Sequence, residues 1–576
     1  MPQVVRSTRR HPVSFCFRLG LYVLFALVPA LTAAGAKGGK VTKPRRAAVA
    51  AVQTGAGQVG QWENSFSTGP LVHLSVLPNG DVLHWTQLFG PPTYTRLWNC
   101  VLIPAENNDP AKLRCDPSRP GEGPGQDIWY SGQDLFCSAH SLLPDGRLLI
   151  TGGTFYFSGN NIVVRGGAHE GIRAATTYRF GDPALMPTTS MQYERWYPTN
   201  VALGSGETVT AAGTYCSERN ADTHQCVCRR YDPPGSTTCA EYAIENALYP
   251  EVFSTSSGTP PVDSWRTLSN AKRLLPLYPW LHYASNGKVF YSGPEVQSAW
   301  LDTTGTGEWT EGPVSSVYRD AGSAVLYDTD KVLIAGGGPN VPTNTAETID
   351  LSAGDAADWE FTGSMAFPRR HHNLTLLADG TVLAVGGTKG PGYNNNCQEN
   401  VVYPAEIWQP STGVWTTMAS MRFRRQYHST AVLLIDGSVL VGGTTEWGSI
   451  DETCKKIPNV YQTEIYSPPY LFNPDGTRAA RPIITYAPPA VTYGQQFLVN
   501  TPSAFAVSKV TMVRLSSVTH SINMNQRINH LSFSRVGAGV RVNAPAASNV
   551  CPPGHYMLFL INSAGVPSVA KVVQIS

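Results

Sequence analysis

Three residues capable of metal or redox chemistry stand at one position of a short repeat. Counting nine residues back from a turn glycine gives Cys137 in FCSAHSLLPDG, Tyr197 in YPTNVALGSG and His428 in HSTAVLLIDG, and Tyr427 directly precedes His428. Equal offsets in a cyclic repeat predict equal radial positions, so a thiol, two phenols and an imidazole should converge near one end of a central axis. Imidazole and phenolate ligands with open positions favour Cu(II), whereas structural zinc sites are closed by thiolates and histidines.

Two further histidines are candidates to complete such a site. His371 also lies nine residues before its turn glycine, whereas His520 lies in VTHSINMNQR, outside the repeats. The position in the repeat, taken alone, favours His371 as the further ligand.

The elements that must position these residues form a repeat that occurs seven times. Each copy reads as a strand, a tight turn and a second apolar strand that closes on glycine, as in LTLLADGTVLAVGG. The turn positions are Gly80, Gly146, Gly206, Gly287, Lys331, Gly380 and Gly437. Spacings of roughly 50 residues are typical of kelch-type propellers, so we expect a seven-bladed β-propeller over residues 59–478.

The pattern changes after residue 478. Segments such as HLSFSRVGAGVRVNAP alternate apolar and polar residues like the strands of a small sandwich, which predicts an immunoglobulin-like domain over residues 479–576. With 54 glycines, 44 prolines and only 15% charged residues, the composition also favours short strands joined by turns. The fold class predicted is all-β.

The N-terminus has the layout of a cleavable secretory signal over residues 1–36, followed by a flexible leader over residues 37–58. Four arginines precede the apolar run LGLYVLFALVPALT and the small residues AGA, and the run is short for a membrane anchor. Cleavage would remove four arginines and no acids, so the formal charge would fall from +2 to −2. We therefore expect a secreted protein, extracellular or associated with the cell wall, without the basic signature of nucleic-acid binding.

Eleven cysteines include Cys16 in the signal, which leaves ten for an oxidising compartment where disulfides are expected. Cys100 with Cys115, and Cys397 with Cys454, are plausible local pairs. A crowded insertion holds Cys216, Cys226, Cys228 and Cys239 with His224 nearby. Disulfides are expected there, and zinc is the alternative. If Cys137 is reserved for chemistry, nine cysteines remain and one thiol can stay free.

Several segments resemble, in order and spacing, the copper radical oxidases, the family of galactose oxidase and glyoxal oxidase. These segments are LFCSAH, RWYPT, QYHSTAVLLIDGSVLVGG, VTHSINMNQR and PPGHYMLFLINSAGVPSVA. The resemblance covers the chain from about residue 70 to its end. The RWYPT form, with Trp196 before Tyr197, is more similar to the glyoxal oxidase branch.

The resemblance implies a role for each residue. Cys137 would be joined through a thioether to the ring of Tyr197, which would bind one copper ion and hold a radical. His428 and His520 would be the other equatorial ligands, and Tyr427 the axial ligand and general base. In this family the C-terminal domain delivers the last ligand, which favours His520 over His371. The implied activity is oxidation of small aldehydes (glyoxal or methylglyoxal type) or primary alcohols, with reduction of O2 to H2O2 and no organic cofactor.

Alignment with galactose oxidase suggests further roles. Tyr215 stands where that enzyme stacks a tryptophan over the cross-linked tyrosine, so it is a possible radical shield, and His372 aligns with a histidine behind the metal ligands. Leu274 occupies the place of the sugar-binding arginine, with Arg273 one residue away, which argues against a sugar substrate.

Two other function classes remain as alternatives. A non-catalytic kelch propeller could bind a protein or polysaccharide through its rim, since most propellers are not enzymes. Zinc-dependent hydrolysis lacks an evident carboxylate base beside the cluster. For the oxidase we expect a monomer that acts on a small substrate and O2, with no nucleic-acid partner and no stable membrane insertion after cleavage of the signal.

Overall fold

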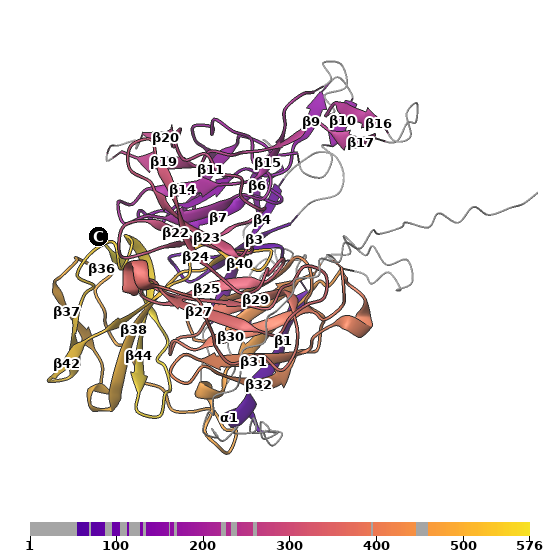
Figure 1. Ribbon diagram of the computed structural model, residues 1–576. Coiled ribbons are helices and arrows are strands. Elements are labelled where there is room, and N and C mark those ends of the chain that lie inside the picture. The colour runs from indigo at the N-terminus through magenta and orange to yellow at the C-terminus, as the bar shows by residue number, and fades with distance from the viewer. Residues whose placement is uncertain are drawn as a thin grey trace, which may run out of the picture. The chain divides into compact units, whose positions relative to one another are not determined.

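The computed structural model describes most of the chain beyond residue 54. The described ranges are 55–67, 71–86, 95–103, 112–114, 127–130, 134–159, 162–165, 170–219, 226–231, 239–256, 258, 262–392, 395–444 and 459–576. Within these ranges strands dominate, and the helices are α1 (Ala56–Val59) and four short 3-10 helices (Figure 1). The 3-10 helices are η1 (Leu351–Ala356), η2 (Gln398–Asn400), η3 (Pro469–Leu471) and η4 (Ala504–Ala506). The all-β prediction is confirmed.

Seven sheets in the described part of the chain each begin with a strand from one of the seven repeats. The first contains β2 (His73–Val76), β3 (Val82–Trp85), β4 (Thr95–Ile103), β5 (Lys112–Arg114) and β6 (Asp127–Tyr130). The second contains β7 (Ala139–Leu142), β8 (Leu148–Thr151), β11 (Ala175–Tyr178) and β12 (Met186–Pro187). The third contains β13 (Thr199–Ala202), β14 (Thr208–Ala211), β19 (Glu251–Thr255) and β20 (Asp263–Thr267). The fourth contains β21 (Trp280–Tyr283), β22 (Val289–Gly293), β23 (Gln297–Asp302) and β24 (Glu308–Val314).

The remaining three sheets follow the same order along the chain. The fifth contains β25 (Ser323–Asp328), β26 (Lys331–Ala335), β27 (Ala346–Asp350) and β28 (Glu360–Phe361). The sixth contains β29 (Arg370–Leu376), β30 (Val382–Thr388), β31 (Pro404–Gln409) and β32 (Val414–Ser420). The seventh contains β33 (Ser429–Leu433), β34 (Val439–Gly443), β35 (Gln462–Ser467) and, as its last strand, β1 (Gln61–Ser67) from the other end of the described chain.

The first strands of these sheets contact one another in sequence. β7 contacts β13, and β13 contacts β21. The series continues through β25, β29 and β33 to β2. β39 (Ser517–Thr519) pairs with β2 and contacts β7. The seven-bladed propeller stays a prediction. The repeats do form separate sheets, and the first strands of these sheets, here called the inner strands, are neighbours.

The first two strands of the sixth and seventh sheets are buried on both faces, and β29, with the sequence RHHNLTL, buries polar as well as apolar side chains. Every residue of β29 and β30 is buried, as are all residues of β33 and β34. Strands enclosed in this way can read as apolar runs rather than as alternating patterns, as β34 does.

The turn residue of each repeat has a left-handed backbone, which explains the choice of glycine. Gly146 and Gly437 have φ of 86° and 80°, a region that is open mainly to glycine. In the fifth repeat the left-handed residue is Asp330, with φ 60°, and not Lys331 as the sequence alignment assumed. Aspartate tolerates this conformation better than most side chains.

Four sheets contain the same buried ion pair. An arginine just before the inner strand reaches a glutamate on the third strand, and both side chains are almost completely inaccessible to solvent. The pairs are Arg195–Glu251 (2.8 Å), Arg319–Glu347 (2.7 Å), Arg369–Glu406 (2.7 Å) and Arg425–Glu464 (3.1 Å). Because a buried guanidinium stays charged, the glutamate is needed to compensate it.

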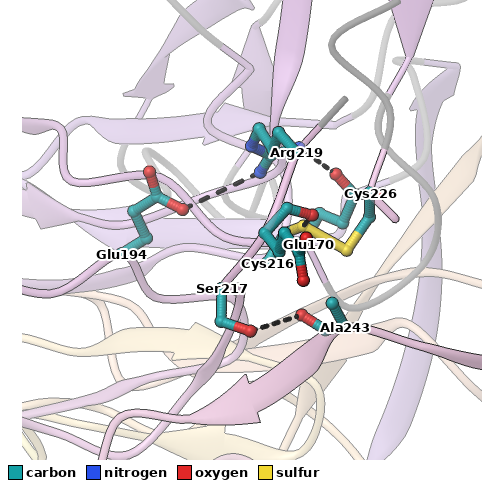
Figure 2. The surroundings of a disulfide bond; sticks show 8 residues. Glu170, Glu194, Cys216, Ser217, Arg219, Cys226 and Ala243 are labelled. Atoms are coloured by element: carbon teal, nitrogen blue, oxygen red, sulfur yellow. Dashed lines mark hydrogen bonds and ion pairs between the residues drawn. A yellow bond between two sulfur atoms is a disulfide. The ribbon is translucent and has the colours of Figure 1, made fainter. Parts of the chain in front are cut away.

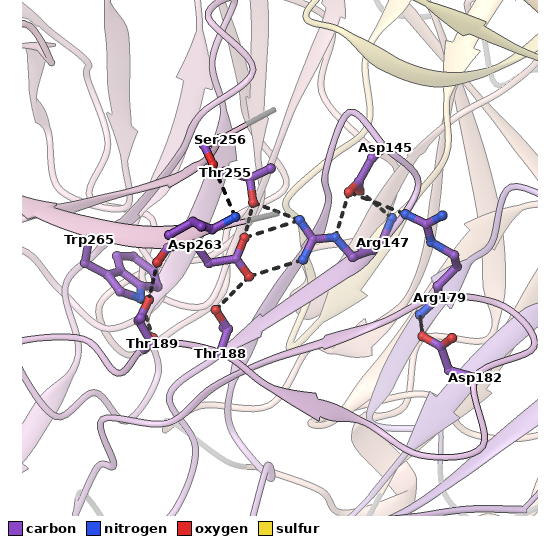
Figure 3. A network of polar contacts seen from close by, with 11 residues as sticks. Asp145, Arg147, Arg179, Asp182, Thr188, Thr189, Thr255, Ser256, Asp263 and Trp265 are labelled. Carbon is purple, nitrogen blue, oxygen red and sulfur yellow. Dashed lines mark hydrogen bonds and ion pairs between the residues drawn. The ribbon is translucent and has the colours of Figure 1, made fainter. Parts of the chain in front are cut away.

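A second polar network ties the second sheet to the third (Figure 3). Arg147, at the start of β8, directs its guanidinium toward the carboxylate of Asp263 on β20, at 3.2 Å. The same carboxylate accepts a hydrogen bond from Thr188 at 2.8 Å. Burial raises the pKa of Asp263, but hydrogen bonds from Thr255, Arg147 and Thr188 outweigh that effect and leave the pKa below its usual value.

The C-terminal strands form two sheets and a separate excursion. One sheet is ordered β36 (Ala490–Val491), β45 (Lys571–Ile575), β44 (Gly554–Asn562), β38 (Val507–Arg514) and β41 (Ile528–Leu531); the other is ordered β37 (Gln496–Asn500), β43 (Gly539–Asn543) and β42 (Phe533–Val536). The excursion is formed by β39 and β40 (Ile522–Asn523), which leave these sheets and extend the first one through β2. His520 lies in the turn between β39 and β40, so a C-terminal segment brings it to the inner strands.

Short hairpins and a disulfide occupy the insertions of the second and third repeats. The hairpins pair β9 (Tyr156–Gly159) with β10 (Ile162–Arg165), β15 (Thr214–Cys216) with β18 (Ile244–Asn246), and β16 (Cys228–Tyr231) with β17 (Cys239–Tyr242). Cys216 and Cys226 form a disulfide, and Arg219 beside it binds the carboxylate of Glu170 (Figure 2). This bond leaves no thiolate at Cys216 or Cys226 for zinc.

Other sequence predictions about cysteines and the N-terminus have mixed outcomes. Cys397 is disulfide-bonded, and its predicted partner Cys454 lies outside the described residues. Among the described cysteines, Cys137 and Cys551 are free and buried. The predicted signal, residues 1–36, lies outside the described part of the chain. Where the structure is described, it has no helix of sufficient length and apolar character to cross a membrane.

Candidate metal centre

The residues at the shared repeat position also share an unusual backbone conformation. Except for Leu71 of the first repeat, they lie in the left-handed region, with φ of 65° at Cys137, 63° at Tyr197, 47° at Tyr278, 53° at Ala321, 55° at His371 and 67° at His428. His520 arrives from the C-terminal segment and has φ of 49°. Such conformations are costly for residues with side chains and persist only where the surroundings enforce them, most often at functional sites.

Backbone hydrogen bonds connect these positions from one sheet to the next. The N–H of Tyr197 donates to the carbonyl of Cys137 at 3.0 Å, and the N–H of Tyr278 donates to the carbonyl of Tyr197 at 2.9 Å. The N–H of His371 donates to the carbonyl of Ala321, the corresponding residue of the fifth repeat, at 2.7 Å. The side chains therefore start from backbone points that are fixed relative to one another.

The two phenols and two imidazoles predicted as ligands lie together. The hydroxyls of Tyr197 and Tyr427 are hydrogen-bonded to each other. The ring of His520 lies 4.5 Å from that of Tyr197, 4.4 Å from that of His428 and 5.7 Å from that of Tyr427, between centroids. Tyr427 and His428 stack on each other at 3.8 Å although they are adjacent in sequence.

The hydrogen bonds of His520 assign its tautomer. Its Nδ1 lies 2.6 Å from the hydroxyl of Thr519, and that hydroxyl has a carbonyl acceptor on Val72 at 2.9 Å. Since the threonine has one proton and gives it to the carbonyl, it must accept from Nδ1–H of His520. The lone pair of His520 is then on Nε2, which lies 4.0 Å from Sγ of Cys137. Orientation of a ligand histidine through its other ring nitrogen is a usual feature of metal sites.

Cys137 is completely buried and interacts with the Tyr197 side chain. Burial raises the pKa of its thiol well above the usual value, although contacts with Tyr197, Thr154 and Trp196 oppose that effect. The thiol is therefore protonated at neutral pH and is not a ready thiolate ligand. The backbone N–H of Cys137 donates to Nε2 of His73 at 3.0 Å.

Two aromatic side chains stack on the ring of Tyr197. The indole of Trp196 stacks on the Tyr197 ring at 3.7 Å with an interplanar angle of 15°, and Tyr278 stacks on it at 4.4 Å. Tyr215, predicted as a possible shield, lies on β15 in the cysteine-rich insertion, where its hydroxyl donates to Glu245 at 3.3 Å. The shielding role of Tyr215 therefore stays a prediction, and the ring stacked on Tyr197 is that of the adjacent Trp196.

Of the two neighbouring histidines in the sixth repeat, His371 borders the site. Its ring contacts that of Tyr427 at 5.0 Å. His372, predicted to support the ligands, is completely buried and packs beside Gly336 of the fifth sheet, where an added Cβ would lie 2.5 Å from its ring. Strand alternation sends these adjacent side chains to opposite faces, and the supporting role of His372 stays a prediction.

Three residues at the site were missed in the sequence. Thr519 and Trp196 each directly precede a predicted ligand, so adjacency was the available signal. His73 had no such signal, because its contact with Cys137 joins two repeats across 64 residues of sequence. It also stacks on Trp85, with ring centroids 4.8 Å apart and planes at 3°.

This donor set fits a metal that accepts phenolate and imidazole. Burial, together with the neighbouring imidazoles, lowers the pKa of His428 and of His520 well below the usual range, so both are neutral. Within the described residues, no group of three or more His, Cys, Asp or Glu side chains is placed to hold a metal ion. The two phenols and two imidazoles that meet here form a donor set that suits Cu(II) better than zinc.

Comparison with known proteins gives consistent results. A family model described as "Galactose oxidase-like, Early set domain" matches residues 481–575. Galactose oxidase of Gibberella zeae is 28% identical over 72% of this chain, and the chain spans only 59% of that relative's length. Aldehyde oxidase GLOX of Vitis pseudoreticulata is 26% identical, with 69% of this chain and 75% of the relative covered.

A solved structure supports the fold. It is described as a novel fungal alcohol oxidase with catalytic diversity among the AA5 family, in complex with copper. The two chains align with a TM-score of 0.69 and 24% identity, over 90% of this chain and 100% of the other.

Proposed function

The comparisons support assignment of this chain to the copper radical oxidase family, and from that premise we propose that it is a copper-dependent oxidase that forms hydrogen peroxide. The observation that carries the proposal is the contact between the hydroxyls of Tyr197 and Tyr427, with the rings of His428 and His520 beside them. A propeller that only bound a partner through its rim would not need this donor set in a strained, buried position.

The proposed ligands are Tyr197, Tyr427, His428 and His520. Copper, when bound, would accept one electron and offer an open position to the substrate. The overall reaction is RCH2OH + O2 → RCHO + H2O2, or RCH(OH)2 + O2 → RCOOH + H2O2 for a hydrated aldehyde. Two electrons and two protons leave the substrate and arrive on oxygen.

The residues of the chain supply the remaining chemistry. Tyr427 accepts the proton of the substrate hydroxyl as general base. The ring of Tyr197 stores the second oxidising equivalent as a radical and accepts a carbon-bound hydrogen. A thioether to Cys137 would lower the oxidation potential of that ring by electron donation, and Trp196 covers the ring against solvent and side reactions.

Small aldehydes are the proposed first choice of substrate. Leu274, at the position of the sugar-binding arginine, is 63% exposed. The nearby Arg273 is held by Glu311 on β24 in a two-point ion pair, at 2.8 and 3.2 Å. Neither residue is thus set up to bind sugar hydroxyls, whereas glyoxal or methylglyoxal would need no such group. Primary alcohols are the second choice.

The architecture and location belong to the same proposal. We propose a seven-bladed propeller over residues 59–478, closed by β1 in the seventh sheet, and an immunoglobulin-like domain over residues 479–576 that delivers His520. The pairing of β39 with β2 supports this delivery. Secretion through residues 1–36 and a monomeric state are part of the proposal and follow from the sequence.

Peptide mass spectrometry after copper loading in air tests the proposal directly. The Cys137 and Tyr197 peptides should remain joined after full reduction, with a mass lower by two hydrogens than the sum of both. Separate peptides from fully copper-loaded protein would sink the radical-oxidase assignment and favour the non-catalytic propeller. Peroxide release should then be compared across methylglyoxal, glyoxal, galactose, glycerol and longer primary alcohols.

Substitution of the thiol separates its chemistry from its packing. Cys137→Ser should keep copper binding but lose the linkage and at least about 100-fold in peroxide production, equivalent to about 3 kcal/mol in the barrier. Cys551→Ser is the matched control, because Cys551 is also a free, completely buried cysteine. Comparable activity in the two variants would remove the proposed role of the thioether.

A further inference from the structure

Two buried arginines of the C-terminal segment lack the carboxylate that compensates the arginines of the sheets. Arg514 is 1% exposed and Arg527 is 5% exposed. Within the described residues neither forms an ion pair with an acidic side chain, in contrast with Arg195, Arg319 and their counterparts. An uncompensated buried charge is strongly unfavourable, so each guanidinium needs another source of compensation.

Arg514 finds this compensation in polar groups of the protein. Its nitrogens donate to the side-chain oxygen of Asn525 at 3.0 Å, the hydroxyl of Tyr556 at 3.1 Å and several backbone carbonyls. These carbonyls belong to Leu142, Pro552 and Pro553. All three nitrogens of this guanidinium therefore have acceptors.

Arg527 is much less well satisfied. Its Nη2 donates to the carbonyl of Tyr283 at 3.3 Å, whereas its Nε is buried and has no hydrogen-bond partner. Both arginines line a cavity of about 30 Å³, which has room for a water molecule or a small ion. The cavity lies among β13, β21 and the segment from Asn523 to Arg527.

A second unsatisfied donor lines the same cavity. The Oδ1 atom of Asn523 accepts the backbone N–H groups of Ser517, Asn525 and Gln526 at 3.2, 3.3 and 3.2 Å. Three donors fix that atom as the oxygen, so the amide orientation is defined. Its Nδ2 is buried and has no partner, and Asn523 lines the cavity together with Arg527.

The residues that line the cavity provide no negative charge. The lining residues include no aspartate or glutamate. Burial and the nearby Arg527 lower the pKa of His282 to about 3, so it is neutral, and burial raises the pKa of the neighbouring Cys551 thiol. Asp330, which does not line the cavity, offsets part of the charge of Arg527 electrostatically, and its carboxylate is held in place by the N–H of Ser285 at 2.7 Å and by the hydroxyl of Ser285.

We propose that this cavity binds a small inorganic anion of the chloride class, held by Nε–H of Arg527 and Nδ2–H of Asn523. A water molecule could accept both hydrogen bonds but would add no negative charge beside the guanidinium. A chloride ion satisfies both donors and the charge together, and it is only slightly larger than water. Asn523 follows His520 by three residues, so the anion would also anchor the turn that carries His520.

Crystals grown with bromide in place of chloride test the site directly. An anomalous bromide peak within hydrogen-bond distance of Nε of Arg527 and Nδ2 of Asn523 is expected. Density for water alone in the cavity, or bromide peaks only at the protein surface, would overturn the proposal.

Thermal unfolding tests binding in solution. At constant ionic strength, replacement of gluconate by chloride should raise the Tm by about 1 °C for each tenfold increase above the Kd. A Tm that does not depend on chloride up to molar concentration would count against the site.

Asn523→Asp provides an isosteric variant that replaces the anion with a side chain. One carboxylate oxygen keeps the three backbone hydrogen bonds, and the other supplies the negative charge beside Arg527. This variant should lose the chloride dependence and the bromide peak, and its Tm without chloride should be no lower than that of the unchanged protein. The control is Asn286→Asp, at an exposed turn where the side-chain oxygen also accepts a backbone N–H, from Lys288 at 3.0 Å.

The variant series has clear opposing outcomes. Retention of full chloride dependence in Asn523→Asp would show that the halide acts elsewhere. If Asn523→Asp fails to fold, Arg527→Met is measured instead, with the exposed Arg541→Met as its control. Loss of chloride dependence in Arg527→Met alone supports the site, and equal dependence in both variants contradicts it.

Discussion

Tyr197 donates its backbone N–H to the carbonyl oxygen of Cys137 across 3.0 Å, and both residues have left-handed backbones. The two side chains proposed to be cross-linked therefore start from backbone atoms that are already hydrogen-bonded. This hydrogen bond keeps the two residues side by side, as formation of a thioether requires. This pre-positioning reduces the entropy that the reaction has to overcome.

The backbone N–H of Cys137 gives a prediction for His73. Its Nε2 accepts the N–H of Cys137, so His73→Phe should keep the stacking on Trp85 but leave that N–H unsatisfied, at a cost of about 1–3 kcal/mol. We expect a slower cross-linking reaction and a smaller fraction of linked peptide at full copper loading. His84→Phe is the control, since His84 is also buried on the first sheet. Equal linkage kinetics in both variants would show that His73 only fills space.

Thr519 is predicted to orient His520. Thr519→Val removes the hydroxyl that fixes the Nδ1–H tautomer, so the copper affinity should fall by about 10–100-fold while the fold is retained. Thr511→Val is a suitable comparison because Thr511 is buried in β38 and its hydroxyl also donates to a carbonyl, that of Ala378. Copper titration measured by competition with a chelator distinguishes the two. An unchanged affinity for Thr519→Val contradicts the orienting role.

Trp196 is predicted to protect the oxidised Tyr197 ring. Trp196→Leu removes the stacked indole and opens the phenol to solvent, so the radical signal should decay at least about tenfold faster, a change of about 1.4 kcal/mol in the barrier. Trp300→Leu, which removes a half-buried indole packed against Phe290 in the fourth sheet, is the control. Electron paramagnetic resonance after oxidation gives the decay rate. Persistence of the radical in Trp196→Leu would assign the protection to Tyr278 or to burial alone.

Asp263 gives a prediction for stability and pH. Its pKa in the folded protein is below the unfolded value of about 3.9, so the ionised carboxylate stabilises the fold above that pH. The contribution is lost as the pH falls through the lower, folded pKa. Asp263→Asn should therefore be less stable than the unchanged protein at pH 7, and the difference in urea unfolding should shrink below about pH 4. A difference that is constant with pH would mean that the network in Figure 3 acts through packing.

The sequence by itself determined the β-strand content and the repeat positions. Turn glycines with apolar runs on both sides predict strands that are buried on both faces, and β29 and β30 have this burial. The nine-residue offset identified Cys137, Tyr197 and His428 because it depends on local register, which the turn fixes. A common register also gives these residues a common backbone conformation.

Only the tertiary structure decided which neighbouring groups meet. His371 lies nine residues before its turn glycine, and its ring contacts that of Tyr427. His520 does not have this offset, and the pairing of β39 with β2 brings it to the other predicted ligands. Likewise, Trp196 stacks on Tyr197, and His73 accepts the N–H of Cys137 from another repeat. These contacts join residues far apart in the chain or depend on side-chain direction. Local register cannot specify them, because the packing of several sheets and one C-terminal segment fixes them together.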